Sequence, residues 1–422
     1  MKEMKTTSIL MAVAIMWSMQ AASKSAEDRW TVNRMTHDEK NLYLATAGHG
    51  LVVIDKLSGV QTFYNVENGL LTHDNLFDVA VLGDVVAVSA GVESQGDGKY
   101  SFIAQQWAEL IDLKSKSTLP ILLSEDDYVA MTTLYEDNPG NEYPTMPING
   151  FCPRVFFNTD GCLWLSVSDC CAARYNLEQR AFTYLTPILT NQQVMSYPKY
   201  AISDIATGND GSLWIAASSF QDKEGNISGP LYQLSERLDV GYDCRSYKWE
   251  EEQACATRCM AKDHDGRLWI GTEEGQVYLF DETGSFVPLL EEGQCSQVVD
   301  IEADVSNHIW MISQDKLFQY NEGSLISVPL PSGTGRLKSL DVDGSAVYIV
   351  AENGLYKYDC GVFNDIKIPA DEDTGISFSE ETGGADVYPQ LFSPDGKRCA
   401  HASKGVSIIR YNNMTTRKLV SK

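Results

Sequence analysis

Short apolar segments alternate with polar turns along almost the whole chain, and three of these segments share one motif. The motif is an Asp-Gly turn followed by an apolar strand that contains a tryptophan, and it reads TDGCLWLSV (159–167), NDGSLWIAA (209–217) and HDGRLWIGT (264–272). In each copy the tryptophan lies three residues after the glycine, which gives the pairs Gly161 and Trp164, Gly211 and Trp214, and Gly266 and Trp269. Period-2 alternation bounded by Asp-Gly turns predicts antiparallel hairpins. No helical periodicity of useful length interrupts them, so the pattern predicts an all-β protein.

Further copies extend the series in both directions. SNHIWMIS (306–313) contains Trp310, with Asn307 in place of the glycine, and asparagine also tolerates a positive φ. Weaker copies at 39–47, 82–90, 343–351 and 394–402 place other residues in or next to the tryptophan column, namely Tyr43, Val86, Tyr348 and Cys399. Four strands per repeat of about 40–50 residues is typical of propeller blades. Eight copies predict a β-propeller of eight four-stranded blades, with seven as the alternative; the interval of 78 residues between Val86 and Trp164 is the least regular.

The repeated residues are expected to be structural. Asp-Gly supplies the hairpin turn, and a tryptophan can pack between neighbouring blades, because buried aromatic side chains dominate core energetics. We assign this role to Gly161, Trp164, Gly211, Trp214, Gly266, Trp269, Trp310 and Tyr348.

The first residues predict export. A basic start is followed by an apolar run at 7–19 and by three small residues, Ala21, Ala22 and Ser23. The run is too short to span a membrane and is followed by polar sequence, which is typical of a secretory signal peptide. We therefore expect a signal peptide at 1–23 and a single propeller domain at 24–422, soluble and periplasmic or extracellular, with no membrane span. The first cysteine is Cys152, which argues against a lipoprotein anchor.

Net charge and cysteine spacing limit which partners and cofactors are expected. A formal net charge of −25 argues against a nucleic-acid partner. The carboxylates form no convincing cluster, no Cys-x-x-Cys pair occurs and the six histidines are scattered, so we expect neither a metal site nor a cofactor. The turn at Asp160-Gly161 brings Cys152 next to Cys170 across a hairpin, so a disulfide between them is one alternative and free buried thiols are the other.

The repeat resembles the two-component-regulator propeller family. KDHDGRLWIGTEEGQVYLFD (262–281) is similar to the family's core repeat, and FYNVENGLLTHDNLFDVAV (63–81) resembles its inter-blade phrase. The resemblance implies the propeller that forms the periplasmic sensing half of hybrid histidine kinases. We expect no kinase activity in this chain, and the family supplies no catalytic residues for it.

Strand order indicates where a ligand would bind. With strands A to D counted from the axis outward, the A–B and C–D turns are short, whereas 91–106 and 219–230 are expected as B–C loops, and 136–150, 187–200 and 371–386 as D–A loops. Binding residues concentrate on loops held by a rigid scaffold. The ligand-binding candidates on these loops are aromatic: Tyr100, Trp107, Tyr143, Tyr197, Tyr200, Phe220 and Tyr388. The alternative is that they hold their own loops in place.

Two function classes follow. The first is a non-enzymatic binding module for an unknown small ligand (glycan or peptide) or protein partner, acting as a sensor or an assembly scaffold. The second is a carbohydrate-active enzyme, a glycosidase or lyase, which would need two carboxylates at a fixed separation. The sialidase Asp-box places Asp five residues before Trp, whereas Asp160, Asp210 and Asp265 lie four before it. We therefore expect no catalytic residues.

Overall fold

The structure is a computed structural model. It describes residues 31–95, 101–121, 154–167, 171–185, 202–208, 210–217, 220–221, 227–228, 231–236, 242–247, 257–280, 284–290, 295–366, 368, 390–392, 398–399, 405–410 and 416–421. The predicted signal peptide lies outside these residues, so it stays a prediction. No helix in the described part of the chain is long and apolar enough to cross a membrane.

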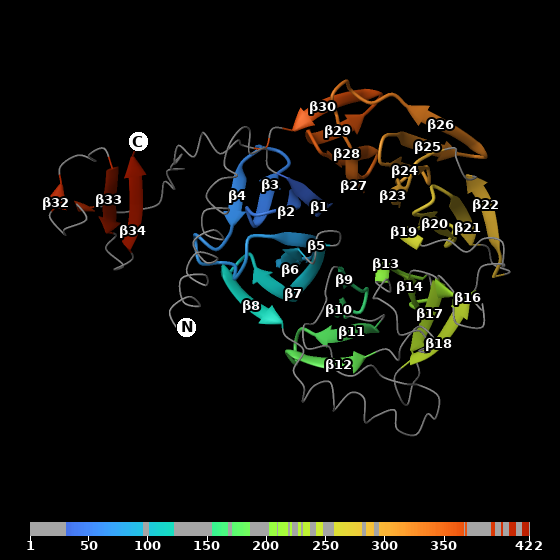
Figure 1. The fold of residues 1–422 in the computed structure, drawn as a ribbon, viewed down its shortest axis with the longest axis horizontal. Coiled ribbons are helices and arrows are strands. Elements are labelled where there is room, and N and C mark those ends of the chain that lie inside the picture. Colours follow the sequence, from blue (N-terminus) through green and yellow to red (C-terminus); the bar gives the residue numbers. More distant parts are fainter. Residues whose placement is uncertain are drawn as a thin grey trace, which may run out of the picture. The chain divides into compact units, whose positions relative to one another are not determined.

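Strands that follow one another in the chain pair into four-stranded antiparallel sheets, which are the blades of a propeller (Figure 1). Blades 1 and 2 consist of β1 (Val32–His37), β2 (Asn41–Thr46), β3 (Leu51–Asp55), β4 (Gln61–Tyr64), and of β5 (Leu76–Leu82), β6 (Val85–Gln95), β7 (Ser101–Asp112), β8 (Ser117–Ile121). Blades 3 and 4 consist of β9 (Val155–Phe157), β10 (Leu163–Val167), β11 (Cys171–Asn176), β12 (Ala181–Leu185), and of β13 (Ile202–Thr207), β14 (Leu213–Ala217), β17 (Leu231–Glu236), β18 (Tyr242–Tyr247). A two-stranded hairpin, β15 (Phe220–Gln221) and β16 (Ile227–Ser228), is inserted between β14 and β17.

The remaining blades follow the same order. Blade 5 consists of β19 (Thr257–Lys262), β20 (Leu268–Thr272), β21 (Val277–Phe280) and β22 (Phe286–Leu290). Blade 6 consists of β23 (Val298–Ala303), β24 (Ile309–Ser313), β25 (Leu317–Asn321) and β26 (Ser324–Val328), and blade 7 of β27 (Leu337–Asp343), β28 (Ala346–Ala351), β29 (Gly354–Asp359) and β30 (Val362–Ile366).

The hydrophobic core lies between blades. The described core residues fall into seven clusters, each shared by two neighbouring blades. One cluster joins Leu42 and Leu44 of blade 1 to Tyr348 and Val350 of blade 7. The last blade therefore packs directly on the first, and the ring of seven blades is closed.

Polar contacts support this closing junction. Lys56 donates to Asp343 Oδ2 at 2.6 Å, and the His37 ring nitrogen Nδ1 lies 2.8 Å from Asp341 Oδ2. In each pair the basic residue belongs to blade 1 and the aspartate belongs to blade 7. Charged groups thus join the two ends of the ring without a shared strand.

The propeller class is confirmed, with seven blades, the number given as the alternative to eight. The chain divides into two compact units, 1–371 and 372–422. The eighth copy of the motif, at 394–402, belongs to the second unit, where β31 (Gln390–Phe392), β32 (Arg398–Cys399), β33 (Gly405–Arg410) and β34 (Thr416–Ser421) pair in the order β32-β31-β33-β34. The motif identifies a hairpin, but it does not say which neighbour the hairpin packs on.

The tryptophan column lies at the junctions between blades. Trp269 is buried and its ring centroid is 4.9 Å from that of Tyr320 in the next blade, and Trp310 packs on Tyr358 in the same way at 5.6 Å. Trp269 Nε1 donates to Asp263 at 3.0 Å, which satisfies the indole inside the core. Trp164 and Tyr348 are also buried, whereas Trp214 is half-buried. The turns before the column have positive φ at Gly161, Gly211, Gly266 and Asn307.

Candidate ligand site at the propeller axis

The innermost strands share a local irregularity near their beginning. In β1, β5, β13, β19, β23 and β27 a β-bulge interrupts the pairing with the second strand, for example between Leu76 and Asp78. A bulge twists the strand and re-aims the side chain beside it. The residues that follow the bulge are Arg34, Asp78, Asp204, Cys259, Asp300 and Ser339, and Arg154 precedes β9 at the corresponding place.

Three of these residues accept hydrogen bonds from backbone N–H groups on the inner edge of the next blade. The innermost strand of a blade has no partner on its axial side, so its N–H groups need other acceptors. Asp78 Oδ2 accepts the N–H of Val155 at 3.0 Å, and Asp204 Oδ2 accepts the N–H of Met260 at 2.9 Å. Asp300 Oδ2 does the same for Leu340 at 3.0 Å. The three aspartates thereby connect blade 2 to 3, 4 to 5 and 6 to 7.

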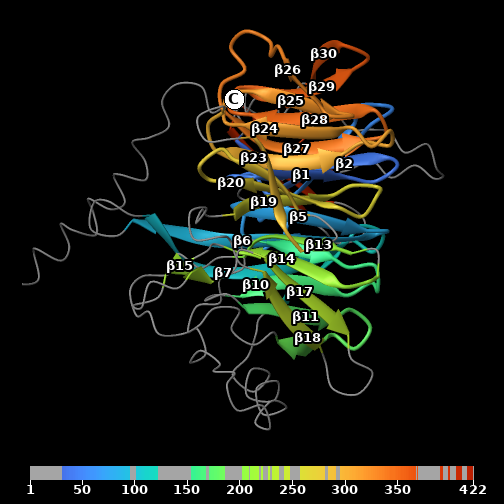
Figure 2. The ribbon, with the colours of Figure 1, turned by 90° about the vertical axis from the view of Figure 1, so that its right-hand side faces the viewer.

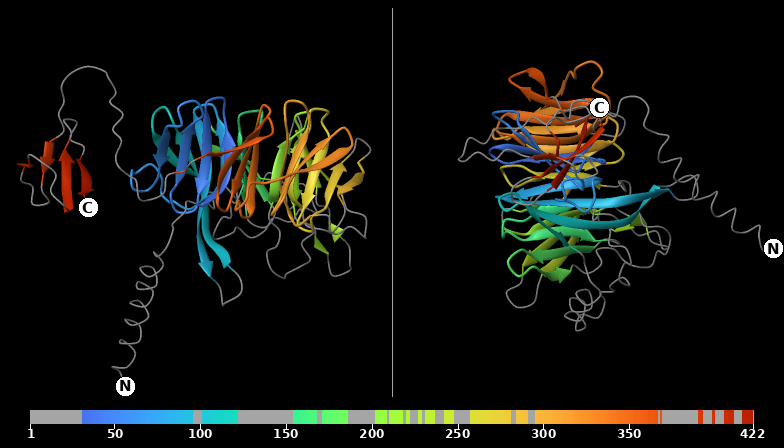
Figure 3. Two further views of the ribbon diagram at one scale, coloured as in Figure 1. Left: turned by 90° about the horizontal axis from the view of Figure 1, so that it is seen from above. Right: turned by 90° about the vertical axis from the view of Figure 1, so that its left-hand side faces the viewer.

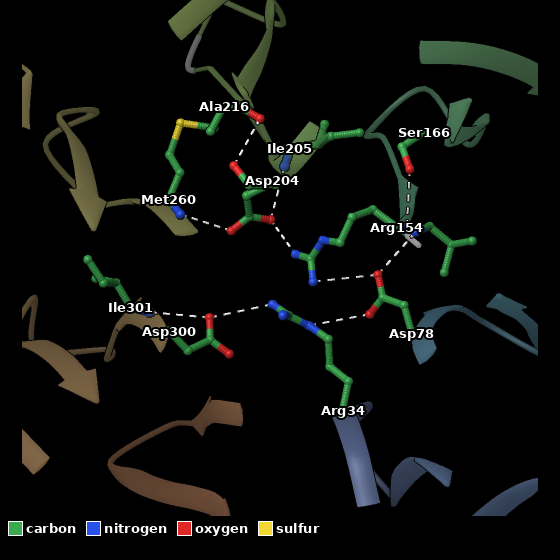
Figure 4. Close-up of polar contacts among 12 residues, drawn as sticks. Arg34, Asp78, Arg154, Ser166, Asp204, Ile205, Ala216, Met260, Asp300 and Ile301 are labelled. Carbon is green, nitrogen blue, oxygen red and sulfur yellow. Dashed lines mark hydrogen bonds and ion pairs between the residues drawn. The ribbon is translucent and has the colours of Figure 1, made fainter. Parts of the chain in front are cut away.

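Two arginines link the three aspartates across the axis (Figure 4). Arg34 Nε lies 3.3 Å from Asp78 Oδ1, and Arg34 Nη2 lies 3.4 Å from Asp300 Oδ1. Arg154 Nη1 lies 3.6 Å from Asp78 Oδ2, and its Nη2 donates to Asp204. We call this series, Asp204–Arg154–Asp78–Arg34–Asp300, the axial ion chain. Burial alone would lower the pKa of Arg34, but the carboxylates of Asp300 and Asp78 outweigh it and raise that pKa, so Arg34 stays charged.

A second group of titratable residues lies further along β23 and β27. Glu302 Oε2 accepts the N–H of Val342 at 3.1 Å. Burial raises the pKa of Glu302 well above its usual range, and the nearby carboxylates of Asp341 and Asp300 raise it further. For His37, burial lowers the pKa, but the hydrogen bond to Asp341 and its charge outweigh burial, so the pKa is raised. On this side of the axis Glu302 and His37 thus have raised pKa values, whereas the other side has arginines.

These residues surround a cavity on the axis. Its volume is about 270 Å³, and all seven innermost strands contribute to its wall. Charged residues include both arginines and the carboxylates of both groups, while apolar ones include Met35, Val155, Ile205 and Met260. A cavity of this kind fits a small polar ligand that can accept and donate hydrogen bonds.

The cavity lies on the axis near the face with the longer connections. Each innermost strand starts on the face of the B–C and D–A connections, and the axial ion chain lies at those starts. On this face the far ends of β6 and β7 project beyond the ring, and the β15–β16 hairpin lies on the same side (Figures 2 and 3). Part of the expected 91–106 loop is thus a β-ribbon, in which Gly91 pairs with Gln106.

The aromatic candidates are only partly described. Trp107 lies in β7 and pairs through the backbone with Ala90 of β6. Phe220 lies in β15 and pairs in the same way with Ser228 of β16. The other aromatic candidates lie outside the described residues, namely Tyr100, Tyr143, Tyr197, Tyr200 and Tyr388. Cys152 and Cys170 also lie outside them. Their roles stay predictions. Within the described ranges Cys162, Cys259, Cys295 and Cys360 are free thiols, and no three His, Cys, Asp or Glu side chains are grouped to hold a metal ion.

Sequence reasoning missed the axial residues, although a signal was present. In every blade the residue after the bulge, or its equivalent, stands eight to ten positions before the tryptophan column. Asp78 precedes Val86 by eight, and Asp300 precedes Trp310 by ten. Aligning the copies further upstream would have shown a second column in which five of seven residues are charged.

Comparisons with known proteins agree on the fold. Residues 253–274 match the family model of the two component regulator propeller, which confirms the resemblance for that segment. A search of the curated proteins gives no match.

Several solved structures are similar. Virginiamycin B lyase from Staphylococcus aureus is 13% identical, with a TM-score of 0.54 over 76% of this chain and 92% of that one. A streptogramin B lyase is 12% identical, with a TM-score of 0.53 over 79% and 93%. The WD40 beta propeller domain of Doa1 is 14% identical, with a TM-score of 0.52 over 81% and 94%. At these identities the likeness shows the fold alone: this chain contains a β-propeller, with one segment that matches the two component regulator propeller.

Proposed function

We propose that the protein is an exported, non-enzymatic binding module that takes a small polar ligand, of the glycan or peptide class, in its axial cavity. A sensor or an assembly scaffold would use such a module. The observation that carries the proposal is the cavity itself, which seven innermost strands surround and which charged side chains line. Family likeness supports it through the two component regulator propeller segment.

The polar lining needs an explanation beyond stability. Replacing buried ion pairs by well-packed apolar residues is often neutral or stabilising by about 1–4 kcal/mol. The backbone N–H groups account for the three aspartates, but a purely structural axis would not need an open volume of about 270 Å³ lined by charged side chains. A polar cavity on the axis is the arrangement expected of a ligand site held on a rigid ring.

The described carboxylates of the axial ion chain are engaged structurally. Asp78, Asp204 and Asp300 each accept a backbone N–H of the next blade and contact an arginine. A nucleophile or general base needs an oxygen that can reach the substrate. These three residues are therefore better suited to shape the cavity than to react.

The test is a ligand screen, followed by binding measurements on variants in which a large side chain fills the cavity. We expect at least one oligosaccharide or peptide of a panel to raise the melting temperature and to bind in a calorimetric titration. Ala80→Trp places a large ring in the cavity wall and is expected to weaken binding at least about tenfold. Thr36→Phe serves as a second, smaller plug.

The matched control is Val305→Trp, which adds the same ring at a residue that is 65% exposed in the β23–β24 turn. This control should bind as the unmodified protein does. Full-strength binding to a folded Ala80→Trp variant would overturn the assignment of the site.

A second candidate is a carbohydrate-active enzyme, a glycosidase or lyase. One specific observation favours it: Glu302 lines the cavity with a raised pKa and could donate a proton, close to the charge of Asp341. A carboxyl group with a raised pKa is suited to act as the general acid that such chemistry requires. If a bound oligosaccharide is turned over, Glu302→Gln should abolish product formation while leaving binding intact; unchanged turnover would reject this candidate.

A further inference from the structure

Among the outer strands that the structure describes, one has an unprotected edge. β26 is the outermost strand of blade 6 and pairs on its inner side with β25, from Leu317 opposite Val328 to Asn321 opposite Ser324. The pairing is regular and has no bulge. Its first four residues are exposed, including Leu325 at 36% and Ile326 at 50%. Apolar side chains are thus open to solvent along a row of backbone groups that no described strand covers.

Other described outer strands are protected against pairing. Proteins blunt an exposed edge with proline, charge, short length or a bulge. β8 contains Pro120, β22 contains Pro288, and β30 contains Asp365. β18 contains Asp243 and Arg245, β4 has four residues, and the pairing of β12 with β11 is irregular. The sequence of β26, SLISV, has none of these devices.

The outer strands of the two neighbouring blades each expose an apolar side chain as well. Val287 of β22 is 41% exposed and Val362 of β30 is 57% exposed, on the blades that flank β26 (Figure 1). These two strands contain Pro288 and Asp365, so among the described outer strands of blades 5 to 7 only β26 combines exposed apolar side chains with an unprotected edge.

We propose that β26 is a docking edge, and that it takes an extended, net basic segment of a protein partner as a fifth strand of blade 6. Main-chain hydrogen bonds to an exposed edge supply affinity in this mode of recognition, and alternate side chains supply specificity. The charge identifies the occupant, because two copies of a chain with a net charge of −25 repel each other, whereas a basic segment is attracted. Glu322, exposed in the turn before β26, adds a negative charge at the end of the edge.

The inference goes beyond the proposed axial site and is tested separately from it. The probe is a fluorescent decapeptide of alternating valine and lysine, whose binding to the full chain is measured by anisotropy. A matched peptide of alternating valine and glutamate, and a valine–lysine peptide with N-methylated amides, serve as controls. We expect binding of the first peptide only.

Two substitutions at one residue separate strand addition from charge attraction. Ile326→Lys and Ile326→Glu both place a charge on the apolar edge, and both should weaken binding at least about tenfold. Leu57→Lys makes the same charge change at a residue that is 98% exposed in the β3–β4 turn, and it should leave binding within about twofold. Because these side chains are exposed, the melting temperatures should stay unchanged.

Four outcomes would overturn the proposal. They are tighter binding by Ile326→Glu, undiminished binding of the N-methylated peptide, no binding of the valine–lysine peptide by the unmodified chain, and a concentration-dependent dimer that Ile326→Lys abolishes. The last would mean that the occupant is a second copy of the chain. None of them bears on ligand binding at the axis, which the Ala80→Trp variant tests.

Discussion

The two sides of the propeller axis balance their charges in different ways. On the side of blades 1 to 4, which we call the paired side, Arg34 and Arg154 alternate with Asp78 and Asp204. On the side of blades 6 and 7, the titrating side, burial and the nearby charges of Asp341 and Asp300 raise the pKa of Glu302, and His37 of blade 1 is bound to Asp341. Fixed positive charge balances the carboxylates of the first side, whereas groups with raised pKa values lie on the second.

The charges of the paired side are fixed, whereas those of the titrating side can change. An arginine keeps its charge at any physiological pH, so the paired side connects its strands under all conditions. A carboxyl group with a raised pKa and a histidine change charge when pH or a ligand changes their surroundings. A ligand that alters the state of this cavity would therefore act on the titrating side.

The largest expected effect comes from the paired side. Asp78→Ala removes the buried carboxylate between Arg34 and Arg154 and the acceptor for Val155 N–H, and it leaves two half-buried arginines less compensated. Breaking a buried pair by removing one partner costs about 3–5 kcal/mol of unfolding free energy. Denaturant unfolding at pH 7 measures it.

The control for this loss is Asp365→Ala in β30, where an exposed aspartate should change the unfolding free energy by less than about 0.5 kcal/mol. An Asp78→Ala variant as stable as this control would show that the axial ion chain does not hold the ring.

Glu302→Gln is expected to have a smaller effect, and one that depends on pH. The folded pKa of Glu302 lies above its unfolded value, so its contribution to stability is present below the unfolded pKa and is lost as pH rises through the folded pKa. Glutamine keeps an acceptor for Val342 N–H and cannot ionise. The variant should therefore gain stability relative to the unmodified protein as pH rises, which unfolding curves between pH 5 and 9 would show. Parallel pH profiles for the two proteins would contradict the raised pKa.

His37→Gln is expected to have the smallest effect, and its pH dependence has the same sign as that of Glu302→Gln. The folded pKa of His37 is raised, so its stabilisation is present below the unfolded pKa and is lost as pH rises through the folded value. The side chain is 23% exposed, so the loss in the variant should stay within about 1 kcal/mol. The difference should appear in unfolding curves at mildly acidic pH and vanish at alkaline pH.

His264→Gln, at an exposed histidine in the β19–β20 turn, is the control and should follow the unmodified protein at every pH. If His37→Gln also has the same stability as the unmodified protein at every pH, the junction of blades 7 and 1 does not depend on the pair of His37 and Asp341.

Sequence reasoning reached the repeated hairpins but not their closure or the axis. The tryptophan copies identified the second strand of blades 3 to 6 because a turn and an aromatic residue are local features. Ring closure depends on which surfaces meet, here Leu42 and Leu44 with Tyr348 and Val350, far apart in the chain. The alternative of seven blades follows from that contact and not from the motif.

The axial site was harder to predict, for a physical reason. Arg34 and Asp300 are 266 positions apart, and their ion pair exists only because the ring brings their strands together. The search for clustered carboxylates along the sequence could not find a cluster to which each blade contributes one residue. The aromatic residues of the long connections were noticed because loop length is visible in the sequence.

The titration of the Glu302 carboxyl group in the folded protein tests the contrast between the two sides most directly. Carbon-13 labelling of the glutamate carboxyl groups, with Glu302→Gln to assign the signal, allows an NMR titration of the folded protein. We predict that Glu302 loses its proton at a clearly higher pH than an ordinary glutamate does. A Glu302 signal that is fully ionised at pH 7 and titrates in the ordinary range of glutamates would contradict the division into a paired side and a titrating side.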